Sequence, residues 1–169
     1  MPWFETVIDL TEGADRLRRR PYGMIEVAEG QFRRVVLRPL PKLLCIPETR
    51  LIGGWRHRHQ PGDLLRIFYN QPWRFPGFLV LKYAESARGT SLGTLTRALA
   101  VLDEIARLKR SDALLCDVAN RRITTELLRR SGWEPHCPSW FHRHYIKRLY
   151  GIYPSPPPWM YSTATTGGC

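Results

Sequence analysis

The spacing of apolar residues along the chain changes at Ser91. From this point leucine and isoleucine recur every three or four positions, and arginine, aspartate and glutamate fall between them. A period near 3.6 is typical of an amphipathic helix that buries one face. We therefore predict a long helix that starts at Ser91. Its buried stripe consists of Leu92, Leu95, Leu99, Leu102 and Ile105.

Before Ser91 the pattern favours strands. Residues 3–10 and 23–39 mix β-branched and aromatic residues with polar ones, and Gly30 stands at the tight position of a hairpin turn inside the second segment. Residues 63–70 and 77–85 are typical of two further strands. The second of them is apolar enough to lie at the centre of a sheet.

Two other parts of the first half carry weaker patterns. Residues 13–20 have room for only one or two helical turns. Residues 39–63 are rich in proline and glycine, so we expect an irregular segment with one short strand at 42–46.

The second half continues the alternation of strand and helix. Residues 113–118 form a strand-like run, Asn120 stands where a second helix would have its N-cap, and Gly132 ends that helix. This order over 77–132 predicts two parallel neighbouring strands joined by a crossover helix. The inward residues of the second helix are Ile123, Leu127 and Leu128. The predicted fold class is α/β (α+β), with a mixed, mainly antiparallel sheet, a central parallel strand pair and flanking helices.

The last part of the chain divides at about residue 150. Beyond Gly132 the pattern is strand-like with a turn near Pro138, and after residue 150 the chain is rich in proline. We take 1–150 as a single domain and 151–169 as a flexible tail of partly polyproline II character.

Composition and cysteine usage indicate the compartment. The chain has 169 residues, of which 43% are hydrophobic and 24% charged, as in an ordinary soluble domain with one core. No apolar run approaches the ~18 residues of a membrane span, and the N-terminus lacks a secretory pattern, so we expect a cytoplasmic protein. The cysteines are scattered without a CxxC pair, which indicates reduced thiols. They are Cys45, Cys116, Cys137 and Cys169.

The charge favours an anionic partner. A formal net charge of +11 fits a phosphorylated cofactor, a nucleic acid or an acidic macromolecule, and does not choose among them. Basic residues are densest between 121 and 150, with aromatic residues between them, which suits the phosphates of a cofactor, a nucleic-acid surface or a solvated face. These basic residues are Arg121, Arg122, Arg129, Arg130, Arg143, Lys147 and Arg148.

One short stretch is either an anion-binding loop or only a polar turn that binds nothing. Residues 87–96 read ARGTSLGTLT, and they connect a strand to the long helix. A helix N-terminus presents unpaired N–H groups and the positive end of the helix dipole. Ser91 would be strained only at a positive φ; its hydroxyl would otherwise bond a phosphate or cap the helix.

These segments together resemble the GNAT superfamily of N-acetyltransferases over about residues 77–134. The family's loop has the pattern Q/R-x-x-G-x-G/A, which Arg88 and Gly93 match and Ser91 breaks at the middle glycine. A second motif, an asparagine that opens a helix ending in glycine and an aromatic residue, is matched by Asn120 and by Gly132 with Trp133. The resemblance implies a GNAT-like fold.

The resemblance also implies a function, which is transfer of an acetyl group from acetyl-CoA, as cosubstrate, to an amine. The family's usual acid, a tyrosine, is replaced by Leu128, so Tyr83 and Glu85 at the end of the preceding strand are the catalytic candidates. The acceptor is not indicated. The residues implied to bind the cofactor are Leu81, Tyr83, Arg88, Gly89, Thr90, Ser91, Leu92, Gly93, Thr94 and Asn120. The alternative is a non-catalytic GNAT-like protein that binds nucleic acid through 121–150.

A cluster of potential metal ligands lies near the end of the domain. His136, Cys137, His142 and His144 fall within ten residues, but zinc sites usually show tighter paired spacing. We predict no metal site.

Overall fold

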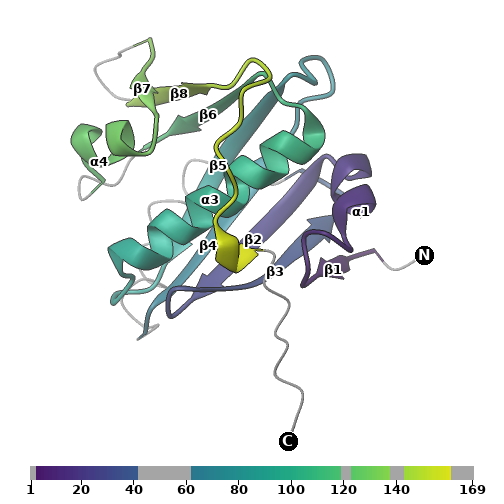
Figure 1. Cartoon of the computed structure of the whole chain (residues 1–169), viewed down its shortest axis with the longest axis horizontal. Coiled ribbons are helices and arrows are strands. Elements are labelled where there is room, and N and C mark those ends of the chain that lie inside the picture. The colour runs from purple at the N-terminus through teal and green to yellow at the C-terminus, as the bar shows by residue number, and fades with distance from the viewer. Residues whose placement is uncertain (1–2, 42–61, 119–122, 138–142, 161–169) are drawn as a thin grey trace, which may run out of the picture.

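The computed structural model describes residues 3–41, 62–118, 123–137 and 143–160, and in these ranges the chain forms one open sheet of eight strands (Figure 1). The strand order is β1-β3-β2-β4-β5-β6-β8-β7. The strands are β1 (Glu5–Val7), β2 (Tyr22–Ala28), β3 (Gln31–Arg38), β4 (Leu64–Asn70), β5 (Phe78–Ser86), β6 (Ala113–Asp117), β7 (Glu134–Pro135) and β8 (His144–Arg148). The helices are α1 (Ala14–Arg19), α3 (Leu92–Lys109), α4 (Thr125–Arg130) and the 3-10 helix η1 (Pro158–Met160).

The predicted mixed sheet is confirmed. β5 and β6 are parallel, from Phe78 opposite Ala113 to Leu81 opposite Cys116, and the other paired strands of the described ranges are antiparallel. The hairpin between β2 and β3 turns at Gly30, as expected, where a positive φ of 65° suits glycine.

α3 lies across one face of the sheet, with α1 on the same side (Figure 1). Leu102 and Ile105 are fully buried in the cluster that also contains Ile25 and Ile67 from the sheet. Each such side chain contributes about 1.5–3 kcal/mol when it is removed from water. Leu92 departs from the predicted stripe, because 57% of it is exposed in the first turn of the helix.

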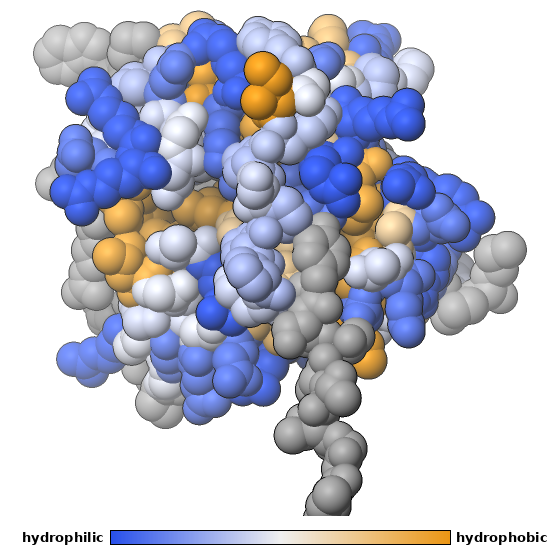
Figure 2. Space-filling view, in the orientation of Figure 1, coloured by the Kyte–Doolittle hydropathy of each residue, from blue (hydrophilic) through white to orange (hydrophobic). Residues whose placement is uncertain are grey.

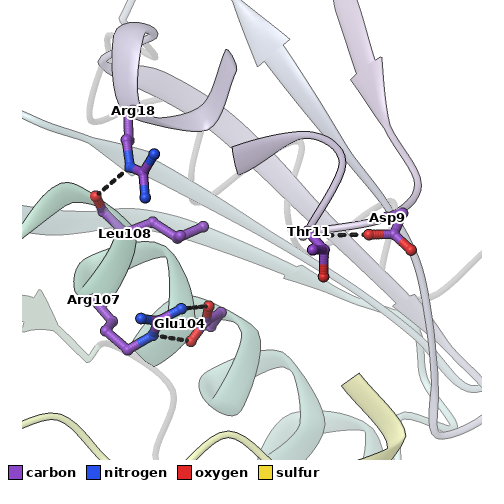
Figure 3. Close-up of polar contacts among 6 residues, drawn as sticks. All are labelled: Asp9, Thr11, Arg18, Glu104, Arg107 and Leu108. Carbon is purple, nitrogen blue, oxygen red and sulfur yellow. Dashed lines mark hydrogen bonds and ion pairs between the residues drawn. The ribbon is translucent and has the colours of Figure 1, made fainter. Parts of the chain in front are cut away.

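Polar contacts hold the far end of α3 against α1. The Arg18 guanidinium of α1 donates to the Leu108 carbonyl of α3 at 3.3 Å. Within α3, the carboxylate of Glu104 accepts two hydrogen bonds from Arg107 (Figure 3). Lys109 donates to the Arg20 carbonyl at 2.7 Å. Figure 3 also shows Thr11 donating its backbone N–H to Asp9 at 2.7 Å, in the turn before α1.

α4 is shorter than predicted, and its N-cap is Thr124 rather than Asn120. The Thr124 hydroxyl accepts a hydrogen bond from the Leu127 N–H at 3.2 Å. A threonine hydroxyl satisfies a first-turn N–H as an asparagine does, so the cap nearer to the apolar residues sets the start. Asn120 lies outside the described residues. Gly132, with a φ of 81°, follows the end of the helix as predicted.

The segment from 151 to 160 packs on the domain, contrary to the unpacked tail that proline content suggested. Met160 belongs to the core cluster, and the Tyr153 hydroxyl donates to the Ser111 carbonyl at 3.1 Å. The Arg97 guanidinium lies 4.1 Å from the ring centre of Trp159. This segment crosses α3 in Figure 1, and apolar surface is visible on either side of it in Figure 2. Contacts of aromatic and methionine side chains therefore fix this segment on the domain, although its proline-rich backbone favours an unpacked chain.

Three further expectations lie outside the described residues: the strand at 42–46, the turn near Pro138 and the residues of the tail beyond 160. None of the helices in the described ranges combines the length and the apolar composition that a membrane span needs.

The buried position of Leu128 yields a first prediction. Only 4% of this residue is exposed, so Leu128→Ala should lower the free energy of unfolding by about 2–5 kcal/mol through lost burial and a cavity. Leu92→Ala, at an exposed position, should change it by about 0.5 kcal/mol or less. Urea unfolding of both variants checks this. A fully stable Leu128→Ala variant would contradict the packing of α4.

Candidate functional site

The two parallel strands separate beside the loop that leads into α3. β5 pairs with β6 only as far as Leu81 and Cys116. Beyond this point β5 continues along β4 to Ser86, and β6 continues along β8 to Asp117, so the strands diverge, as Figure 1 shows. The loop 87–91 follows the end of β5, beyond its pairing with β6, and α3 begins directly after it.

A β-bulge in β5 decides which way the candidate catalytic residues face. Phe68 lies opposite Tyr83, but the next residue, Tyr69, lies opposite Leu81, which leaves Lys82 as an extra residue. Residues opposite one another share a face of the sheet. Leu81 therefore shares the α3 side with the buried Tyr69, whereas Tyr83 lies on the other side, with its ring centre 6.1 Å from that of Phe68.

Glu85 lies on the same side as Tyr83, opposite Arg66. Arg66 also donates to Glu26 at 2.7 Å, and Arg34 donates to Glu26 at 3.1 Å. Burial raises the pKa of Glu26, but the hydrogen bonds and charges of the two arginines outweigh it and hold the pKa below its ordinary value. Glu85 thus stands at the end of a row of alternating charges that crosses β3, β2, β4 and β5.

Ser91 is the N-cap of α3. Its φ is −80°, and its hydroxyl oxygen accepts a hydrogen bond from the Thr94 N–H at 3.1 Å. The backbone here does not require glycine, so the steric cost considered for Ser91 does not arise. Of the two roles expected for the Ser91 hydroxyl, the structure shows the helix cap.

A carboxylate of the chain itself occupies this helix N-terminus. Asp63, just before β4, accepts the Ser91 N–H at 2.9 Å through Oδ1 and the Ser91 hydroxyl at 2.7 Å through Oδ2. Partial burial raises the pKa of Asp63, but hydrogen bonding from Thr94 and Ser91 outweighs it and holds the pKa below its ordinary value. Asp63 is therefore ionised at neutral pH. Sequence analysis missed this residue, because nothing local to positions 87–96 refers to a residue so far away in the chain.

Most backbone N–H groups of the loop that was expected to bind phosphate already donate hydrogen bonds within the protein. The Gly89 N–H donates to the Gly62 carbonyl at 3.2 Å and the Thr90 N–H to the Ala87 carbonyl at 3.2 Å. The N–H groups of Leu92 and Gly93 have no hydrogen-bond partner among the described residues. Among the described residues, these two amides in the first turn of α3 are the candidates for binding a ligand.

The side chains of the loop likewise include some that are bonded within the protein and one that is exposed. The Thr90 hydroxyl donates to the Leu64 carbonyl at 2.8 Å, and the buried Thr94 hydroxyl accepts the Gly30 N–H at 2.9 Å, so neither hydroxyl is directed to a ligand. Arg88 is exposed, which suits an incoming anion. Asn120, which the resemblance also implies for the cofactor, lies outside the described residues.

The loop as it stands fits a pyrophosphate only in part. Arg88 and the Leu92 and Gly93 amides suit phosphate oxygens, but the Asp63 carboxylate holds the Ser91 amide and would repel a second anion. A pyrophosphate could occupy the whole α3 N-terminus only after Asp63 had left it.

Other candidate groups are less available for chemistry. Cys116 is buried, and burial together with the nearby Asp117 raises the pKa of its thiol to about 12. His136 contacts Cys137 at 3.4 Å, but the described residues hold no group of three or more potential metal ligands, and His142 lies outside them.

The basic segment from 121 to 150 is largely paired where the structure describes it. Lys147 contacts Asp103 at 2.8 Å, Arg130 contacts Glu126 at 3.4 Å, and Arg148 pairs with Glu134. Arg121 and Arg122 lie outside the described residues. Lys147 is buried in its pair, whereas Arg130 and Arg148 stay exposed in theirs.

Comparisons with known proteins add little to this geometry. No protein-family model and no curated protein matches the chain. Among solved structures, the crystal structure of nourseothricin acetyltransferase is similar with a TM-score of 0.41 and 12% identity, over 86% of this chain and 98% of that one. The description of the fold therefore rests on the strand order and register of the chain itself.

The cap at Ser91 yields a second prediction. Ser91→Ala removes the acceptor for the Thr94 N–H and a donor to Asp63, so the free energy of unfolding should fall by about 0.5–2 kcal/mol. Thr96→Ala, at an exposed position of the same helix, should change it by about 0.5 kcal/mol or less. Thermal unfolding measured by circular dichroism compares the two. Equal stability of both variants would show that Ser91 is not the cap.

Proposed function

We propose that the chain is an acyl-CoA-dependent N-acyltransferase of GNAT-like type, which transfers an acetyl group to an amine. The observation that carries the proposal is the divergence of β5 and β6 at the loop that opens α3. This places a helix N-terminus beside an opening in the sheet, an arrangement suited to a phosphorylated ligand at one end and a reacting group at the other. The sequence resemblance over 77–134 independently supports it.

Arg88 and the amides of Leu92 and Gly93 would bind the phosphates of acetyl-CoA, which supplies the activated acetyl group when it is bound. A guanidinium and N–H groups at a helix N-terminus both favour phosphate oxygens. Leu81 lies at the last paired position before the strands part, and it packs against the core. It would contact the cofactor at the point of divergence.

Tyr83 and Glu85 are the proposed catalytic residues. An amine attacks an acyl group only when it is neutral, so a base has to accept its proton and an acid assists the leaving thiolate. Glu85 suits the first task and the Tyr83 hydroxyl the second. Leu128 has no ionisable group and is buried, so it offers no acid from α4. Because Tyr83 and Glu85 face away from α3, the amine would approach from that side of the sheet.

Within the described part of the basic segment, Lys147 is buried against Asp103, which favours this reading over nucleic-acid binding there. Binding to nucleic acid releases counterions in proportion to the phosphates neutralised, which requires basic groups that are free to contact them.

Calorimetric titration with acetyl-CoA tests the proposal. The parent protein should bind, and Arg88→Ala should weaken binding at least fivefold, about 1 kcal/mol, with a larger loss at low salt. Arg19→Ala removes the same charge from the exposed surface of α1 and should leave binding unchanged within twofold. A parent protein that does not bind acetyl-CoA would refute the proposed function. Equal losses in both variants would mean that net charge, and not Arg88, acts on the ligand.

A further inference from the structure

Asp63 is held in place by its backbone as well as by its carboxylate. Its carbonyl accepts the Glu29 N–H at 2.7 Å, and the carbonyls on either side, of Gly62 and Leu64, accept the N–H groups of Gly89 and Ala87. The segment 62–64 is thus attached to the loop before α3 at several points. Displacing the carboxylate from Ser91 requires rotation of one side chain, and the surrounding backbone can stay where it is.

The carboxylate and a phosphate would compete for the same helix N-terminus. Both are anions that accept hydrogen bonds from N–H and O–H donors at a helix N-terminus and gain from the helix dipole. Asp63 engages the Ser91 N–H and hydroxyl, which directly precede the open amides of Leu92 and Gly93. A phosphate bound at these amides would lie close to the Asp63 carboxylate, and the two charges would repel.

We propose that Asp63 is an internal competitor for the phosphates of acyl-CoA, and that it determines the affinity of this site. In the ligand-free protein the Asp63 carboxylate holds the N-terminus of α3. Ligand binding drives the carboxylate away from Ser91, and part of the binding free energy is used in doing so. This inference rests on the proposed function, because it takes acyl-CoA phosphates to be the ligand of the loop.

Asp63→Asn tests the competition directly. Asparagine keeps the size of the side chain and an oxygen that can accept the Ser91 N–H, but it carries no charge. The variant should bind acetyl-CoA at least tenfold more tightly than the parent protein in calorimetric titration. Asp15→Asn, the matched control, makes the same charge change on the exposed surface of α1 and should bind within twofold of the parent. Equal affinities of the parent protein and Asp63→Asn would overturn the competition and leave the proposed function standing.

Inorganic pyrophosphate separates failure of this inference from failure of the proposed function. If neither protein binds acetyl-CoA, the proposed function is refuted, and pyrophosphate alone decides the role of Asp63. Tighter binding of pyrophosphate by Asp63→Asn than by the parent and Asp15→Asn would uphold the competition for phosphate. Equal binding, or none, would overturn it.

A measurement on the parent protein guards against a variant that fails to fold. The carboxyl carbon of Asp63 can be followed by NMR as the pH is varied, with and without saturating pyrophosphate. Loss of the hydrogen bonds from Ser91 and approach of a phosphate both disfavour the ionised carboxylate, so the pKa of Asp63 should rise when the ligand is present. An unchanged pKa would show that the carboxylate stays on Ser91, which contradicts the inference.

Discussion

The parallel pairing of β5 and β6 is the constraint on which the rest of the site depends. Parallel neighbours cannot be joined by a tight turn, so the chain has to cross one face of the sheet before it returns. α3 makes this crossing, and its buried leucine and isoleucine residues supply the apolar contact that holds it there. Because the helix starts directly after β5, its N-terminus necessarily lies at the edge where the two strands part. One pairing thus places the loop, the helix dipole and the divergence of the sheet together.

The parts of this arrangement that follow from local sequence could be predicted. The helical period after Ser91 and the apolar runs of β5 and β6 report burial residue by residue, so the crossover and its parallel strands follow from pattern alone. Gly132 could be predicted for the same reason, since a left-handed residue after a helix is a local requirement. The start of α4 shows the limit of local patterns. Asn120 and Thr124 are both residue types that favour an N-cap, so the sequence pattern alone does not distinguish them, and the structure has Thr124.

The parts that depend on distant contacts could not be predicted. The bulge at Lys82 arises from the register between β4 and β5, and it turns Tyr83 and Glu85 away from the face that simple alternation from Leu81 gives them. The contact of Trp159 with Arg97 brings a proline-rich segment onto α3, although its composition is typical of an unpacked tail. The ion pairs between basic and acidic side chains could not be predicted either, because the net charge does not show which residues lie close together in the fold.

The contact of Asp63 with Ser91 also depends on distant residues, but it has a functional consequence. It decides whether a phosphate can replace the carboxylate at the N-terminus of α3. A negative charge near a helix N-terminus stabilises the helix by about 0.3–1 kcal/mol, and a bound phosphate would supply the same interaction. The bond from the Thr94 N–H to the Ser91 hydroxyl does not involve Asp63, so the first turn of α3 keeps one cap whichever anion is present. Asp63 is only partly buried, and its carboxylate can regain water when it rotates away. Exchange of the two anions would therefore leave the helix folded, and the affinity for the ligand would be set by their competition for the same helix N-terminus.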